Sequence, residues 1–272
     1  DDTGDVAANT GTLTSTVLSG LGMTGTLTYG TLTTVNIALG SGGDTFTIES
    51  THAGATNLSA NNGNDTVNVR STAGATSIDT GAGANTVNVG SLAPGGGGNV
   101  NGIAGLLTVT GGGTDTLNVD DTGDGAANTG TLTGTTLTGL GMTSGIAYSS
   151  IETLNINLGA GGDTFTIAST SAGVTNLNAN DGNDTINVRA TTGATNINTG
   201  AGTNVVNAGS LTPATNGNVN AIAGLVTVTG DGTDTLNVDD TGDGAANTGT
   251  LTGTTLTGLG MTSGIAYTGI ET

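Results

Sequence analysis

The sequence lacks cysteine, tryptophan and lysine, and it holds only two phenylalanines and three tyrosines in 272 residues. Without cysteine the chain can form neither a disulfide framework nor a thiolate metal site. Without large aromatic side chains it cannot fill the wide core of an ordinary globular domain of this length. Valine, isoleucine, leucine, alanine and threonine are present instead, and they suit a thin core between closely spaced strands.

Positive charge is almost absent, because 21 acidic residues face two arginines and the formal net charge is −19. Such a chain has no cations to place against phosphate, which excludes nucleic acid and anionic membrane surfaces as partners. No stretch reaches the eighteen apolar residues of a membrane span, so membrane insertion is not expected. The surplus of carboxylates points instead to cations as ligands.

A long repeat organises the chain. The segment DDTGD begins at Asp1 and returns at Asp120 and Asp239, which is a period of 119 residues. The units expected from this period are residues 1–119, 120–238 and 239–272. The last of them is truncated, so we expect the chain to be a segment of a longer array.

A shorter period of about 20 to 30 residues runs inside each unit. Each member is a glycine-rich turn followed by Asp-Thr or Asn-Thr and a short apolar strand, as in Asn61–Arg70 (NNGNDTVNVR). A second short strand such as Thr56–Ala60 precedes the turn. Glycine, threonine, asparagine and valine are poor helix formers. The pattern predicts an all-β fold, a β-solenoid of the parallel β-helix or β-roll kind with one such repeat per rung.

Alternation within the strands assigns their two faces. Val67 and Val69 share the side that is predicted to point inward, whereas Thr66 and Asn68 point outward. When rungs stack about 4.8 Å apart, like residues lie above one another. The predicted inner column is Phe46, Val67, Val87 and Leu117, and the predicted outer column is Thr45, Thr66, Thr86 and Thr116.

One turn motif carries the chemistry. Aligned on its acid, the turn reads x-G-x-G-x-D-x-U-x, where U is a large apolar residue. The acids of the full matches are Asp44, Asp115, Asp163 and Asp234, and those of turns with asparagine at the first glycine are Asp65 and Asp184. Asn85 and Asn204 replace the acid in one rung of each unit, which should weaken the adjoining sites. Since the acid shares the parity of the inward apolar residue, its carboxylate is expected to curl beneath the turn.

This motif resembles the calcium-binding nonapeptide G-G-x-G-x-D-x-U-x of RTX (haemolysin-type) repeats. The resemblance implies that backbone carbonyls and aspartate carboxylates of successive turns enclose Ca²⁺, a cation that takes six to eight oxygen ligands. It covers one turn of each rung only, because the return turn Arg70–Thr76 (RSTAGAT) carries no such motif. More generally, the chain resembles the Gly/Thr/Asn/Asp-rich strand repeats of large bacterial surface, adhesin and matrix proteins.

Two interpretations of the turn aspartates remain open. Carboxylates stacked about 4.8 Å apart repel by roughly 3.5 kcal/mol per pair at an effective dielectric constant of 20, and a divalent cation converts that repulsion into attraction. Alternatively, each aspartate caps its turn by accepting hydrogen bonds from nearby backbone, as in Asx turns. A second acid cluster has the same two interpretations, a loop calcium site or a solvated turn. It comprises Asp120, Asp121 and Asp124, with copies at Asp1, Asp2, Asp5 and at Asp239, Asp240, Asp243.

Catalytic groups are scarce. The single histidine, His52, is replaced by Ser171 in the next unit, so no acid–base histidine repeats and no enzyme is expected. The predicted function is structural: a calcium-stiffened segment of a secreted bacterial fibre, adhesin stalk or matrix protein at the cell surface. It would extend by self-association or by covalent continuation, near cell-surface or matrix polysaccharide. The alternative is an adhesin whose outward Thr/Asn face binds glycan or ice.

Overall fold

The protein is described by a computed structural model that covers residues 1–271, so Thr272, the last residue of the third predicted unit, lies outside it. Within the described residues the chain forms 25 short strands and no helix, hence no helix that could cross a membrane. Most strand pairs are parallel. The predicted all-β solenoid is confirmed.

By its internal contacts the chain divides into two compact units. The first comprises Asp1–Gly123 and Thr138–Leu154, and the second comprises Asp124–Leu137 and the chain from Asn155 onward. Two strands, β13 (Thr136–Gly139) and β15 (Thr153–Asn157), cross these boundaries.

The first unit holds twelve further strands in two sheets. They are β1 (Thr10–Leu13), β2 (Val17–Gly20), β3 (Leu27–Thr28), β4 (Thr34–Ala38), β5 (Thr45–Ile48), β6 (Ala55–Ser59), β7 (Thr66–Val69), β8 (Thr76–Asp79), β9 (Thr86–Val89), β10 (Leu107–Thr110), β11 (Thr116–Asp120) and β14 (Ile146–Ser149). One sheet has the order β11-β9-β7-β5-β1-β2-β3, and the other has the order β14-β10-β8-β6-β4. A rung therefore consists of one strand from each sheet, as predicted.

The second unit is built in the same way. Its strands are β12 (Thr129–Leu132), β16 (Thr164–Ile167), β17 (Val174–Asn178), β18 (Thr185–Val188), β19 (Thr195–Asn198), β20 (Thr203–Ala208), β21 (Val226–Thr229), β22 (Thr233–Val238), β23 (Gly249–Leu251), β24 (Thr255–Gly258) and β25 (Ile265–Thr268). Their orders are β22-β20-β18-β16-β12 in one sheet and β23-β24-β25-β21-β19-β17 in the other.

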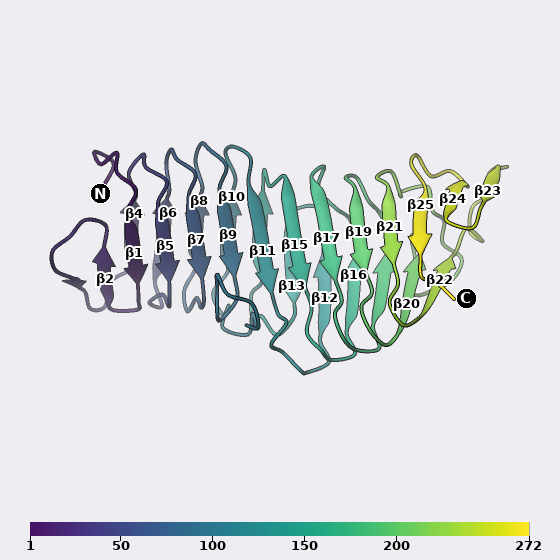
Figure 1. The fold of residues 1–272 in the computed structure, drawn as a ribbon, viewed down its shortest axis with the longest axis horizontal. Helices are drawn as coiled ribbons and strands as arrows, with labels where there is room; N and C mark the ends of the chain where they lie inside the picture. The colour runs from purple at the N-terminus through teal and green to yellow at the C-terminus, as the bar shows by residue number, and fades with distance from the viewer. Residues whose placement is uncertain (272) are drawn as a thin grey trace. The chain divides into compact units, whose positions relative to one another are not determined.

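Stacking in register builds a thin core. Strands β5, β7, β9 and β11 lie side by side in parallel (Figure 1) and pair residue for residue. Phe46, Val67, Val87 and Leu117 are each at most 1% exposed, while the threonine before each of them points outward and pairs with its neighbour along the stack. Both predicted columns are confirmed. The core is only two side chains deep, which is why the chain needs few large residues.

Asparagine side chains add a second line of contacts on the outside of the sheets. Asn88 Nδ2 donates to Asn68 Oδ1 at 2.9 Å, and Asn118 Nδ2 donates to Asn88 Oδ1 at 2.8 Å. The second unit contains the same arrangement, for instance between Asn196 and Asn176 at 2.8 Å. Each rung is thus tied to the next by backbone and by side-chain hydrogen bonds.

Residues 10–28 depart from the parallel pattern in a way that the sequence did not predict. Strand β1 pairs with β2, and β2 with β3, in antiparallel fashion, and β1 pairs in parallel with β5. Strands β23, β24 and β25 form the same antiparallel set. The reversal after β2 uses consecutive residues with positive φ, Gly20 (81°), Leu21 (52°) and Gly22 (71°). Such a left-handed turn reverses the chain within a few residues, so these strands pair locally.

Candidate metal centre

The motif aspartates form a ladder on the inside of the turn. Asp44, Asp65 and Asp115 are each 1% exposed, so the predicted inward orientation is correct. Asp44 Oδ1 accepts a hydrogen bond from the backbone N–H of Asn9, and Asp65 Oδ1 accepts one from the N–H of Asp44, both at 2.7 Å. Asn85 Oδ1 accepts the next, from the N–H of Asp65, at 2.8 Å. Each side chain therefore satisfies a backbone donor of the preceding rung.

The ladder is longer than the motif indicated. Asp115 Oδ1 accepts from the N–H and from Nδ2 of Asn85, and Glu152 Oε2 accepts from the N–H of Asp115 at 2.6 Å. The second unit repeats the series with Asn128, Asp163, Asp184, Asn204, Asp234 and Glu271. Sequence reasoning missed the terminal Asn9 and Glu152. The one feature of the sequence that could have indicated them is Asn85, which stands in place of an aspartate and shows that an amide oxygen can replace a carboxylate oxygen as the acceptor.

Four of the six motif aspartates have a second carboxylate oxygen that is buried without a hydrogen-bond partner. These oxygens are Oδ2 of Asp44, Asp65, Asp163 and Asp184. In Asp115 the same oxygen accepts from the backbone of Gly112 and Gly113 and from Thr80 Oγ1 of the preceding rung. Part of the difference lies in the preceding rung, where Leu39 holds the position before Asp65 that Thr80 holds before Asp115.

The buried pairs are electrostatically costly. Burial raises the pKa of Asp65 and of Asp184 to about 6, against the lowering effect of the backbone hydrogen bond and with a further increase from the neighbouring carboxylate. Burial also raises the pKa of Asp163. An ionised carboxylate with one oxygen unpaired in an apolar site loses hydration without compensation. Each pair therefore favours a bound proton or a bound cation.

The backbones of successive turns approach each other closely. A Cβ on Gly63 would lie 2.1 Å from the carbonyl oxygen of Gly42, and one on Gly83 would lie 1.6 Å from that of Gly63. Glycine is thus required because a side chain at these positions would collide with the carbonyl oxygen of the preceding turn. Carboxylate and carbonyl oxygens are the ligands that Ca²⁺ prefers.

The Asp44–Asp65 and Asp163–Asp184 pairs fit Ca²⁺ in donor type and in having unsatisfied oxygens. Throughout the part of the chain that the structure describes, no group of three or more acidic or histidine side chains could hold a metal ion. Each pair would therefore contribute two carboxylates, with carbonyls and water completing the ligand set. Asp115 and Asp234 differ, because hydrogen bonds already occupy both of their carboxylate oxygens.

The second acid cluster fastens loops. Its three carboxylates accept hydrogen bonds from backbone N–H groups: Asp120 Oδ2 from Gly98 (2.9 Å) and Asp121 Oδ1 from Val100 (3.0 Å) in one loop, and Asp124 Oδ1 from Ala126 (2.9 Å) in its own turn. Its copy makes the equivalent bonds, from Gly217 to Asp239, Val219 to Asp240 and Ala245 to Asp243. This geometry favours turn and loop capping. A loop calcium site at these acids stays a prediction.

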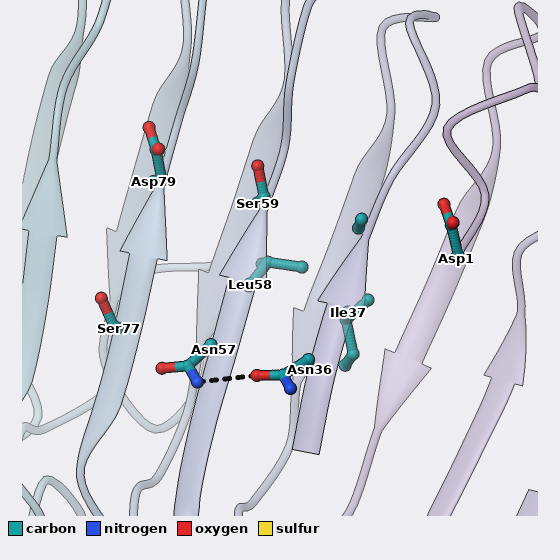
Figure 2. A pocket seen from close by; sticks show the side chains of 9 residues that line it. Asp1, Asn36, Ile37, Asn57, Leu58, Ser59, Ser77 and Asp79 are labelled. Atoms are coloured by element: carbon teal, nitrogen blue, oxygen red, sulfur yellow. Dashed lines mark hydrogen bonds between the residues drawn. The ribbon is translucent and has the colours of Figure 1, made fainter. Parts of the chain in front are cut away.

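The first unit carries a shallow groove of about 550 Å³ across β4, β6 and β8, lined by both apolar and polar side chains (Figure 2). Asn57 Nδ2 donates to Asn36 Oδ1 at 2.8 Å within it, and Ser59, Ser77 and Asp79 line it further. Elsewhere the outward Thr/Asn face is interrupted, since Asn187 is 1% exposed and accepts a hydrogen bond from Thr212 Oγ1. A continuous flat array of the kind that ice binding needs is therefore absent at that position.

Arg70 and Glu49 form an ion pair on the surface of the first unit. Arg70 Nη1 lies 2.7 Å from Oε1 and 2.8 Å from Oε2 of Glu49, and Nε donates to the carbonyl oxygen of Ala93. In the second unit Arg189 Nε keeps the equivalent bond, to Thr212, but Ala168 replaces the glutamate.

Replacing Ala168 with glutamate is expected to restore this pair and to raise the free energy of unfolding by less than about 1 kcal/mol, because the pair is partly solvated. Thermal unfolding at low and high salt measures it, and the gain should fade at high salt. Glu49→Ala is the matched control and should lose a similar amount. A gain that persists in high salt would contradict the ion-pair explanation.

Comparison with known proteins gives no relative from which a function could be transferred: no family model matches the chain, and no curated protein matches its sequence.

Proposed function

We propose that the chain is a non-catalytic structural segment, a stiff β-solenoid that spaces or links the parts of an extracellular bacterial fibre, adhesin stalk or matrix protein. In this proposal Ca²⁺ binds at the Asp44–Asp65 and Asp163–Asp184 pairs. The observation that carries the proposal is the internal ladder with its four unsatisfied carboxylate oxygens.

Three sets of contacts support stiffness. Successive rungs share parallel backbone pairing, an outer asparagine ladder and an inner aspartate–asparagine ladder. In a stacked fold of this kind each rung contacts only its neighbours, so stability and rigidity accumulate rung by rung. Bending would have to break contacts on all three lines.

The proposed role of calcium follows from charge. At neutral pH Asp65 and Asp184 ionise in buried sites although burial raises the pKa of each to about 6, and the chain has no lysine to neutralise them. A divalent cation supplies the missing positive charge, and because it binds the folded state it adds its binding free energy to folding. Residues Asp44 and Asp65 would hold it in the first unit, Asp163 and Asp184 in the second. Such dependence suits a protein that meets abundant calcium only outside the cell.

A calcium titration followed by circular dichroism and thermal unfolding tests the proposal, with magnesium and a chelator as controls. We expect the melting temperature to rise with calcium and to fall in chelator at pH 7. Magnesium should be less effective, because it demands a stricter octahedral geometry. An unchanged melting temperature in chelator, together with no binding heat in calorimetry, would remove calcium from the proposal.

Recognition of a neutral glycan is a second candidate, favoured by the groove over β4, β6 and β8, where amide, hydroxyl and carboxylate groups stand beside the apolar Ile37, Ala38 and Leu58. Its lining offers no aromatic ring on which a sugar could stack and no cation for an acidic sugar. Cell-surface or matrix polysaccharide binding is therefore best tested on a glycan array, where Asn57→Ala should abolish any signal that arises from this groove.

A further inference from the structure

Six asparagines lie together on the outward face of one sheet in the second unit. Strands β17, β19 and β21 are neighbours in this sheet (Figure 1), and β15, whose residues from Asn155 onward belong to the same unit, adjoins β17. The asparagines form two rows that run from rung to rung, Asn155–Asn176–Asn196 and Asn157–Asn178–Asn198. This surface is called the amide face.

An exposed apolar row borders the amide face. Val174 and Leu225 are 38% and 43% exposed, and Ala194 lies between them in the strand register. All three share the outward side with the asparagines, because side chains at even separations along a strand point the same way. The rows are about 6.6 Å apart along the strands, and the residues of one row are about 4.8 Å apart from rung to rung.

The ladder bonds leave part of the amide chemistry free. Asn176 Nδ2 donates to Asn155 Oδ1 at 2.7 Å, and Asn196 Nδ2 donates to Asn176 Oδ1 at 2.8 Å. An amide nitrogen has two hydrogens and an amide oxygen has two lone pairs. Asn176 and Asn196 therefore each keep a donor and an acceptor position for a ligand.

Charge is absent from the amide face, although the chain carries a net charge of −19. None of the six side chains is ionisable, and the bordering row is apolar. Depletion of charged residues is the compositional sign of an interface core. The first unit provides a natural comparison, because four of the six asparagines are replaced there, by Ala38, Ser59, Ser77 and Asp79.

We propose that the amide face binds a neutral polysaccharide whose extended chain lies along the stack of rungs. Amides that repeat once per rung suit a linear polymer of similar repeat length, because each sugar ring can then meet one rung. Sugar hydroxyls donate and accept hydrogen bonds as amides do, and the C–H faces of the rings bury apolar surface against the bordering row. The net charge of the chain disfavours an acidic polymer, and it equally disfavours a second copy of the chain.

This inference adds a binding activity to the proposed structural role. It rests on the second candidate function, recognition of a neutral glycan, and assigns that recognition to a different surface from the groove over β4, β6 and β8. Since the amide face contains no carboxylate, binding should be equal in calcium and in chelator while the fold persists. Failure of the calcium proposal therefore leaves this test interpretable.

Affinity electrophoresis of the full chain tests the proposal, in native gels that contain hydroxyethylcellulose or galactomannan as the extended neutral polymer. Gels with dextran, which is flexible, and with polygalacturonate, which is acidic, provide the comparison. We expect retardation by the extended neutral polymers alone, weakened at least fivefold by the double variant Asn176→Ala/Asn196→Ala. The matched control is Asn207→Ala/Asn237→Ala, because these residues make the same ladder bonds on the other sheet of the unit. Its retardation should equal that of the parent chain.

A gain-of-function variant keeps the test decisive if loss of the ladder bonds disturbs the fold, which circular dichroism checks. Ser77→Asn together with Asp79→Asn extends both rows in the first unit and removes the charge of Asp79 from that face. Retardation by the extended neutral polymers should then increase at least twofold.

The outcomes separate the alternatives. Retardation that falls in the first double variant and rises in the gain-of-function variant supports the proposal. No retardation by any neutral polymer, or retardation that both variants leave unchanged, would overturn it. If Asn57→Ala alone abolishes retardation, the glycan candidate stands at the groove and the amide face is refuted. Self-association without polysaccharide that is lost in Asn176→Ala/Asn196→Ala would replace the polysaccharide with a second copy as the occupant.

Discussion

Replacing both Asp65 and Asp184 with asparagine is expected to stabilise the chain in chelator at pH 7 and to abolish its stabilisation by calcium. Burial raises the pKa of both carboxyls to about 6, about two units above the ordinary value, so ionisation at neutral pH costs up to about 3 kcal/mol per site. Asparagine removes that cost and keeps the ladder acceptor. Allowing for imperfect amide pairing, we expect a gain of roughly 1–3 kcal/mol per site.

The ladder itself shows that asparagine is tolerated there. Asn85 occupies the next rung, accepts the backbone N–H of Asp65 through Oδ1, and donates through Nδ2 to the following rung. In the variant, the backbone N–H of residue 65 would still donate to Asn85 Oδ1, and the side-chain oxygen of the asparagine would still accept the N–H of Asp44. The substitution therefore changes charge more than shape.

The pH dependence follows from the same shift. A carboxyl whose pKa is raised by folding contributes stability that is fully present below its unfolded value near 4, and this contribution is lost as the pH rises through about 6. In chelator, the free energy of unfolding of the parent chain should therefore fall between pH 4 and pH 7 relative to the double variant. Excess calcium should reduce this difference, since the metal requires ionised ligands.

Chemical unfolding of the parent chain and the double variant, at several pH values with chelator or calcium, measures these effects. Asp115→Asn is the control, because hydrogen bonds fill both oxygens of Asp115 and an amide cannot accept at both positions. That variant should be destabilised at every pH. Equal pH profiles for the parent and the double variant would contradict the burial argument. An intact calcium response in the variant would show that calcium does not bind at Asp65 and Asp184.

Replacing Gly83 with alanine is expected to destabilise the first unit by about 3–5 kcal/mol, the size typical of backbone strain combined with a steric clash. Gly83 has φ of 136°, where alanine is strained, and a Cβ there would lie 1.6 Å from the carbonyl oxygen of Gly63. That contact is with backbone, so no side chain can rotate away from it. The rungs would have to separate locally and break the ladder beside Asn85.

Urea unfolding measures the loss, with Gly96→Ala as the matched control. Gly96 has no atom within 4 Å of an added Cβ and no positive φ, so its replacement should change stability by no more than about 0.5 kcal/mol. Similar values for the two variants would show that turn stacking is less tight than described.

Much of the fold was predictable because it depends on local patterns. The alternation of Val67 and Val69 with polar neighbours gave the inward face, and the spacing of the glycine turns gave the rung. The antiparallel set at residues 10–28 was not predicted, because its short apolar strands also satisfy the parallel pattern and the choice depends on the left-handed turn at Leu21.

The candidate site was predicted in part. The motif identified six aspartates and their inward direction, but not the acceptors Asn9 and Glu152 that end the ladder. These two stand outside the glycine motif and reach the ladder only through the stacking of rungs, at sequence separations of 35 and 37 residues.

By itself the sequence determined the solenoid rung and its inward side chains, because these follow from period-two alternation and from the regular spacing of the turns. It also determined the requirement for glycine, because only glycine allows the turns of successive rungs to approach so closely. Only the tertiary structure decided which aspartates are chemically unsatisfied. Oδ2 of Asp115 accepts hydrogen bonds from Gly112 and Gly113 of its own turn and from Thr80 of the preceding rung, whereas Oδ2 of Asp65 is buried without a partner and Leu39 stands in the place of Thr80. The contribution of Thr80 comes from a residue one rung away, which only the stacking of rungs brings into contact with Asp115.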